Sequence, residues 1–197
     1  MRTAPRKRKG LASRGHPATA KVTKAEKYQQ RVDMYGAVSG SGPVACETKT
    51  SQERRAITNQ KTGKKGVKGY TKAMLKDFLT KKLAPKLKAK REKMTVCMDK
   101  GLALKKDEAK EALQKGGARN IQDIWILPTN SAKFVSPLDN TLWHALKERV
   151  RARKPETEEE TAEVLRAEFM GFSATEIKQY YKHCGLTSKE DPFKDLS

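Results

Sequence analysis

Apolar residues recur at helical spacing in several parts of the chain. The first is residues 70–90, where one face collects Met74, Leu75, Phe78, Leu79 and Leu83. Pro85 should end or kink this helix, because proline lacks the amide proton that a helix interior needs. The pattern predicts further helices over residues 105–117, from Asp139 to the break at Pro155, over 157–172 and over 173–185.

Local start and stop signals support these helices. A Gly-Gly pair should end the helix over 105–117. Ser173 and Glu176 have the spacing of a capping box, in which each residue satisfies a backbone amide near the other. The helix after Asp139 carries an apolar stripe made by Leu142, Trp143, Leu146 and Val150.

Shorter apolar runs predict strands. The segment "QRVDMYGAVSGSGPVACET" (30–48) should form a β-hairpin with its turn at "SGSGP". "MTVCM" (94–98) and "IQDIWILP" (121–128) are continuous apolar runs, typical of buried strands. Residues 49–69 are polar and contain several glycines, so we expect a loop or a weak edge strand there. The order ββ, α, β, α, β, α, α, α predicts an α/β fold with helices packed on a mixed sheet.

The charge of the chain favours a polyanionic partner. Lys and Arg number 43 against 23 Asp and Glu, a formal net charge of +20 over 197 residues. Residues 31–154 hold 29 of the basic and 12 of the acidic side chains, so a nucleic acid should contact this part and the basic N-terminal arm. No apolar run is long enough for a membrane-spanning helix. The N-terminus lacks the apolar core of a secretory signal, and three scattered cysteines fit a reducing compartment.

Composition divides the chain into three parts. Residues 1–29 should be a flexible basic arm, in which "PRKRK" (5–9) is a candidate nuclear localisation signal or simply a solvated tail. Residues 30–154 should form the folded domain. Residues 155–197 should form a helical extension, which holds more acidic than basic residues.

Asp99 and Asp139 are the candidate catalytic and metal-binding residues. Asp99 ends the strand over 94–98, and Asp139 opens the helix that follows the strand over 121–128. If these strands are neighbours, both carboxylates can meet at one edge of the sheet and hold Mg²⁺ or Mn²⁺ for phosphodiester cleavage. Local roles are the alternative, because an aspartate before a helix is commonly an N-cap, as Asn140 also could be, and one after a strand is commonly a turn residue.

Four segments resemble the catalytic domain of Tc/mariner-type DDE transposases, which have an RNase H-like fold. They are "VDMYGAVSGSGPV", "KGYTKAMLKDFLTKKLAPKL", "MTVCMDKGLALKKDEAKEAL" and "IWILPTNSAKFVSPLDNTLWHALK", and together they run from about residue 30 to about residue 150. The resemblance implies that Asp99 is the second catalytic acid and Asp139 the third. It also implies a divalent metal cofactor and DNA as the substrate.

The chain departs from the family pattern in three places. The family's first catalytic aspartate precedes the segment similar to "VDMYGAV", where this sequence has only the basic arm, and Asp33 lies inside that segment. Lys100 stands where the family often has asparagine, and its ammonium group competes with a cation. A shift of the turn by one residue would align Asn140 in place of Asp139. These departures imply an N-terminally truncated relative that binds DNA, with cleavage impaired or lost.

The basic end of the helix after Asp139 is the predicted DNA contact, with a solvated basic face as the alternative. It contains Lys147, Arg149, Arg151, Arg153 and Lys154. We expect DNA as the partner and the nucleus as the location, with a homodimer as an option and neither a membrane nor a small-molecule substrate. The alternative function is a non-catalytic, basic nucleic-acid-binding accessory protein, whose binding would depend on salt but not on metal.

Overall fold

The computed structural model describes residues 31–58, 63, 65–67, 69–90, 92–100, 104–128 and 130–186. Its strands are β1 (Asp33–Ser39), β2 (Gly42–Lys49), β3 (Met94–Asp99) and β4 (Ile121–Leu127). Its helices are α1 (Ser51–Ala56), α2 (Lys72–Phe78), α3 (Ala84–Lys88), α4 (Lys106–Lys115), α5 (Ala132–Val135), α6 (Trp143–Arg153), α7 (Glu158–Met170) and α8 (Ala174–His183), with π-helical turns η2 (Leu79–Leu83) and η4 (Leu138–Leu142). The predicted basic arm and the "PRKRK" signal lie outside the described residues.

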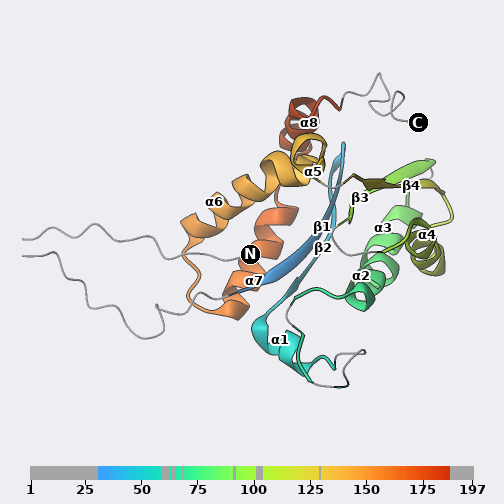
Figure 1. Cartoon of the computed structure of the whole chain (residues 1–197). Helices are drawn as coiled ribbons and strands as arrows, with labels where there is room; N and C mark the ends of the chain where they lie inside the picture. The colour runs from blue at the N-terminus through green and yellow to red at the C-terminus, as the bar shows by residue number, and fades with distance from the viewer. Residues whose placement is uncertain are drawn as a thin grey trace, which may run out of the picture.

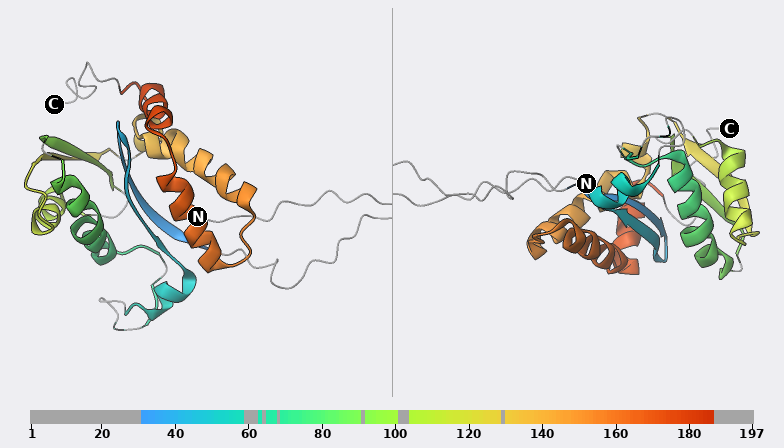
Figure 2. Two further views of the ribbon diagram at one scale, coloured as in Figure 1. Left: turned by 180° about the vertical axis from the view of Figure 1, so that it is seen from behind. Right: turned by 90° about the horizontal axis from the view of Figure 1, so that it is seen from below.

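The predicted hairpin is confirmed, and it stands between two layers of helices. β1 and β2 pair antiparallel, with α2 and α3 on one side and α6 and α7 on the other (Figures 1 and 2). Side chains on β1 alternate between the two layers, as the period of a strand requires. Tyr35 and Ala37 pack against the core of α2 to α4, whereas Met34 and Val38 pack against the core of α6 to α8.

The first core joins α2, η2, α3 and α4 to β3 and β4. The apolar face predicted over residues 70–90 is buried, from Met74 to Leu83. Pro85 neither ends this helix nor leaves it regular: the wider π turn η2 comes before it, and α3 continues to Lys88 with Pro85 in its first turn. A proline is tolerated in a first helical turn because the amide groups there have no intrahelical partner.

The second core joins β1 to α6, α7 and α8. Leu142, Leu146 and Val150 of the predicted stripe are fully buried. The close contact between β1 and the helices depends on Gly36, because a Cβ atom there would lie 2.7 Å from the Phe169 ring and 2.8 Å from the Trp143 ring. The helices predicted over 157–172 and 173–185 are confirmed as α7 and α8.

Three expectations about the strands and loops need correction. The polar segment over 49–69 begins with the short helix α1, whose capping box is formed by Thr50 and Glu53. β3 was predicted as a buried central strand, but alternate residues of it are exposed, which leaves one of its faces uncovered, and its partner among the described strands is β4 alone. In place of one mixed sheet, the described residues form two separate two-stranded sheets, β1–β2 and the parallel pair β3–β4.

None of the helices formed by the described residues is long and apolar enough to cross a membrane.

Candidate active site

The two predicted acids are carried by elements that pack in different cores. Asp99 is the last residue of β3, in the first core, and it is exposed. Asp139 lies in η4, which leads directly into α6 of the second core. The N-cap role proposed for Asp139 is not seen, because Pro137 holds the N-cap position of η4 and the Asp139 amide donates to the Ser136 hydroxyl at 3.4 Å.

Asp99 and Asp139 nevertheless line one cavity, of about 1400 Å³. Partial burial of the carboxyl raises the pKa of Asp139 above its ordinary value, and the negative charge of Asp99 raises it further. Hydrogen bonds from the Ser136 hydroxyl and the Trp143 indole favour the ionised carboxylate and oppose this rise. The structure therefore brings the two acids close enough for the charge of one to affect the other.

Asn140 was the other candidate for the position of Asp139, and its side chain is engaged elsewhere. Its amide donates to the backbone carbonyl of Phe134 at 3.3 Å and also hydrogen-bonds with Cys184. Asp139 is the residue of this pair that lines the cavity. The geometry therefore favours Asp139 over Asn140 as the candidate metal ligand at this position.

A third acid, Asp123 on β4, also lines the cavity but is held by other contacts. Its carboxylate forms a 2.6 Å ion pair with Lys106 and accepts a hydrogen bond from the indole of Trp125 at 2.9 Å. Hydrogen bonding from Lys106 is the largest cause that lowers the pKa of Asp123. In the parallel register Asp123 lies opposite Thr95, four residues before Asp99. The sequence analysis did not single it out, since its position at the start of a strand gave no signal.

Among the described residues, no group of three or more His, Cys, Asp or Glu side chains is placed to hold a metal ion. Asp99 and Asp139 supply two carboxylates, which are the oxygen ligands that Mg²⁺ and Mn²⁺ prefer.

The predicted DNA contacts lie on α6 and just after it, where acidic side chains compete for them. The arginines pair with glutamates: Arg149 with Glu176, Arg151 with Glu148, and Arg153 with Glu168. Lys154 follows the helix in a left-handed conformation and is exposed. Lys147 is half-buried, and within the described part of the chain neither lysine forms a salt bridge.

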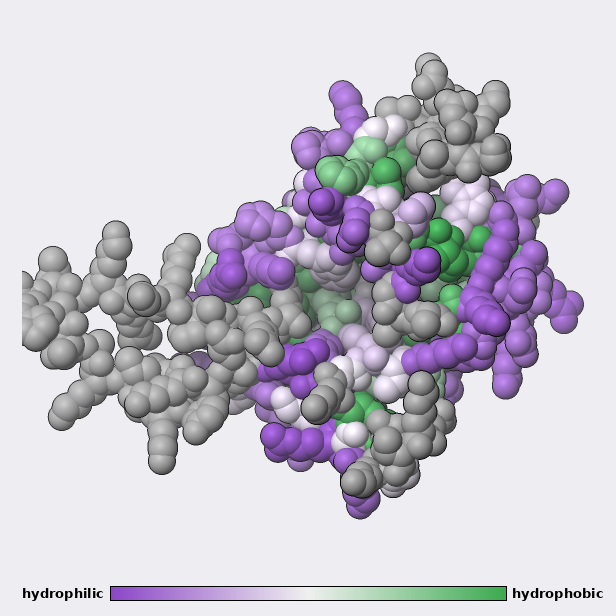
Figure 3. All heavy atoms as spheres, in the orientation of Figure 1, coloured by the Kyte–Doolittle hydropathy of each residue, from purple (hydrophilic) through white to green (hydrophobic). Residues whose placement is uncertain are grey.

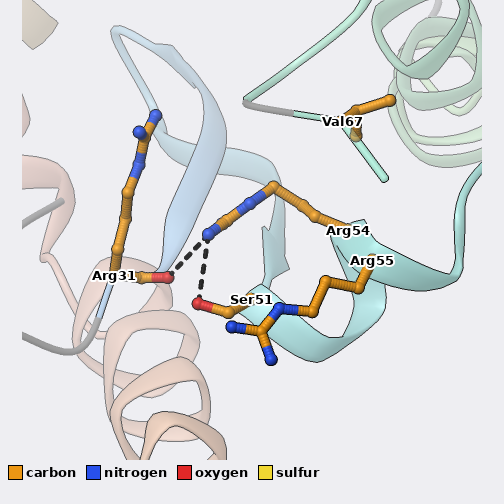
Figure 4. Close-up of a pocket in the computed structure, with 5 residues that line it drawn as sticks. All are labelled: Arg31, Ser51, Arg54, Arg55 and Val67. Carbon is orange, nitrogen blue, oxygen red and sulfur yellow. Dashed lines mark hydrogen bonds between the residues drawn. The ribbon is translucent and has the colours of Figure 1, made fainter. Parts of the chain in front are cut away.

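A second, smaller cavity of about 270 Å³ is lined mostly by basic residues, one of which pairs with Asp33. Arg31, Arg54 and Arg55 line it, and Figure 4 shows the Arg54 guanidinium reaching the Arg31 carbonyl and the Ser51 hydroxyl. Arg54 also forms a buried ion pair with Asp33, at 2.9 Å. Asp33 therefore ties β1 to α1 and does not face the cavity of Asp99 and Asp139.

An α/β chain of high positive charge, with two carboxylates converging on one cavity, has the features of a phosphoryl-transfer nuclease. Comparison with protein families supports this class. The family described as DDE superfamily endonuclease matches residues 40–177, which is more than half of the 197 residues and includes both acids. The chain belongs to this family.

Membership implies an RNase H-like fold, a divalent metal and a nucleic acid substrate, whereas the described residues themselves show only the two small sheets and their helices. Searches among curated proteins and among solved structures found no match.

Proposed function

We propose that this chain is a transposase-derived protein of the Tc/mariner type, which binds DNA and cleaves it weakly or not at all. The observation that supports a nuclease-derived site is the cavity that Asp99 and Asp139 share, together with the rise that Asp99 causes in the pKa of Asp139. Two carboxylates that line one cavity repel each other, and this repulsion is costly unless a cation offsets it.

Asp99 and Asp139 would hold a divalent cation, Mg²⁺ or Mn²⁺. When bound, such a cation neutralises charge on a phosphodiester and lowers the pKa of a bound water. The protein's own contribution is to place the two carboxylates: Asp99 at the end of β3, and Asp139 at a helical start where Ser136 and Trp143 orient it.

Weak cleavage is supported by the groups around these acids. Lys100 follows Asp99 directly and is exposed, and its positive charge competes with a cation for the same carboxylate. Asp123, a further carboxylate that lines the cavity, is already neutralised by Lys106. Cation binding by two carboxylates in this setting should be weak.

DNA binding would rest on Lys147 within α6, on Lys154 just after it, and on the basic arm. Each arginine of α6 must give up its ion pair with a glutamate before it can bind a phosphate, which reduces its net contribution to the free energy of DNA binding. Lys147 and Lys154 carry no such cost, so they should contribute more per residue. Nuclear location remains a prediction from "PRKRK".

Cation binding can be measured by titrating the full chain with Mn²⁺ and following the free ion by electron paramagnetic resonance. We expect one weak site that is lost in Asp99→Asn and in Asp139→Asn. Asp107→Asn is the matched control, because Asp107 is exposed on α4 and does not line the cavity. Equal Mn²⁺ binding by all of these variants would show that the two acids do not form the site.

DNA binding and cleavage need separate readouts. Affinity for a duplex should fall steeply with salt, and Lys147→Ala with Lys154→Ala should reduce the slope of log K against log salt by about 1 per lysine. Lys115→Ala, on exposed α4, is the control. With Mn²⁺ and supercoiled DNA we expect at most slow nicking. Efficient nicking that Asp99→Asn abolishes would overturn weak cleavage, and absent DNA binding would overturn the binding role.

A further inference from the structure

Two lysines line the cavity that holds the acids, and both come from α8. Lys178 and Lys182 are one helical turn apart, so their side chains lie on the same face of this helix. Among the described residues that line the cavity, these two carry the positive charge, and the negative charge is on Asp99, Asp123 and Asp139. Nothing in the sequence singled the lysines out, because they lie in the extension that holds more acidic than basic residues.

Contacts of α8 with the rest of the fold fix the direction of this face. Ile177 is fully buried in the second core. The Tyr181 hydroxyl donates to the backbone carbonyl of Val38 in β1 at 3.2 Å, and Tyr181 itself lines the cavity. The helix stands at one end of the hairpin, where it contacts β2 and η4 (Figures 1 and 2). It therefore cannot turn its lysines away from the cavity without breaking these contacts.

The C-terminal end of α8 lies close to the segments that carry both acids. Cys184, just after the helix, hydrogen-bonds through its thiol with Asn140 in η4, the turn that carries one acid. Burial, followed by the charges of the Cys97 and Cys184 thiols, raises the pKa of Tyr181 to about 12. Cys97 belongs to β3, the strand that carries the other acid. The two lysines are therefore presented beside the place where the acids would hold a phosphodiester.

The charges of both lysines are available to a ligand. The two side chains are exposed, and no salt bridge within the described part of the chain involves either of them. Glu176, the acidic residue of α8, is already engaged by Arg149 and by its capping box with Ser173. Figure 3 shows hydrophilic side chains over the end of the molecule that carries α8. A negatively charged ligand would meet these lysines without first breaking an ion pair, unlike at the arginines of α6.

Two ammonium groups beside two carboxylates suit a phosphodiester strand that crosses the cavity. A lysine binds a phosphate as a point charge on a flexible stem, and Cβ atoms one turn apart are separated by about 5–6 Å, so both side chains can reach one strand. We propose that Lys178 and Lys182 bind the DNA backbone phosphates that flank the phosphodiester held at Asp99 and Asp139. This proposal rests on the proposed function and makes α8 the helix that positions the strand over the acids. Such contacts fix where the strand lies without reading its bases.

Acetylation of lysines, followed by mass spectrometry, locates the contact on the full chain without any substitution. Saturating duplex DNA should slow acetylation of Lys178 and Lys182 severalfold. Lys86 and Lys115 are the matched controls and should react at an unchanged rate, because they are exposed on α3 and α4 and do not line the cavity. Protection of the α6 lysines without protection on α8 would overturn this inference and leave the proposed function standing. A chain that binds no DNA at all would overturn the proposed function as well.

Paired variants test the same contact through its charge. Lys178→Ala with Lys182→Ala should lower the slope of log K against log salt by about 2, and the corresponding pair of arginine variants should keep the slope of the parent. Lys86→Ala with Lys115→Ala removes the same charge away from the cavity and should leave the slope unchanged. An equal loss in both alanine pairs would mean that net charge alone matters. That result, or an unchanged slope in the α8 pair, would overturn the inference.

Discussion

The buried ion pair between Arg54 and Asp33 offers the sharpest test of what holds the hairpin in place. Their side chains are only 8% and 9% exposed, and Arg54 also donates to two backbone carbonyls, at Lys49 and Arg31. Replacing Arg54 by alanine removes the buried partner of the Asp33 carboxylate, whose pair with the half-exposed Arg31 remains. Removing one partner of a buried pair costs about 3–5 kcal/mol, because the remaining charge is poorly solvated.

Urea unfolding followed by circular dichroism measures this loss. With a slope of about 2 kcal/mol per molar urea, a loss of about 4 kcal/mol lowers the midpoint by about 2 M. Arg55→Ala is the matched control: Arg55 is its exposed neighbour on α1, and the change should stay within about 0.5 kcal/mol. The double variant Arg54→Met with Asp33→Asn should recover part of the loss. If Arg54→Ala is no less stable than Arg55→Ala, the pair does not anchor β1.

Two further predictions concern the acidic cavity and the contact of β1 with the helices. The pKa of Asp139 is higher in the folded state than in the unfolded state, so protonation of this carboxyl stabilises the fold. This contribution is complete below the unfolded pKa of about 4 and is lost as pH rises through the folded pKa. In urea unfolding, Asp139→Asn should therefore be more stable than the parent at pH 7 but not at pH 3, and an equal gain in stability at both pH values would refute this prediction. In a carboxyl NMR titration, Asp99→Asn should lower the pKa of Asp139. Gly36→Ala should cost about 1–3 kcal/mol in thermal unfolding through its clash with Phe169, whereas Gly40→Ala, with no atom within 4 Å of the added carbon, should cost less than 1 kcal/mol.

Local signals in the sequence predicted most of the elements because those elements depend on local chemistry. The stripe from Leu142 to Val150 and the capping box of Ser173 fix helices wherever they pack. The same chemistry was overlooked at Thr50, whose capping box with Glu53 starts α1. The exposure of one face of β3 was not predictable in this way, because burial of a strand depends on which elements pack on its two faces.

The acidic site shows the same division between local and tertiary information. Spacing in the sequence indicated that Asp99 follows a strand and Asp139 begins a helix, and both positions are seen. The neutralisation of Asp123 by Lys106 was not predictable, since it joins α4 to β4 across the fold. Nor did the sequence indicate that Arg153 pairs with a glutamate of α7.

The position of one acid relative to the other depends on the hairpin. Asp99 is carried by β3 in the first core, and Asp139 by η4 beside the second. β1 contacts both cores, Tyr35 on one side and Met34 on the other, so it is the element that holds the two carboxylates at a fixed separation. Loosening β1 should let the acids move apart before either core unfolds, and the pKa of Asp139 would then fall towards its ordinary value. A variant that loosens β1 away from both acids, such as Arg54→Ala, should thus lower the pKa of Asp139 in a carboxyl NMR titration although neither acid is changed.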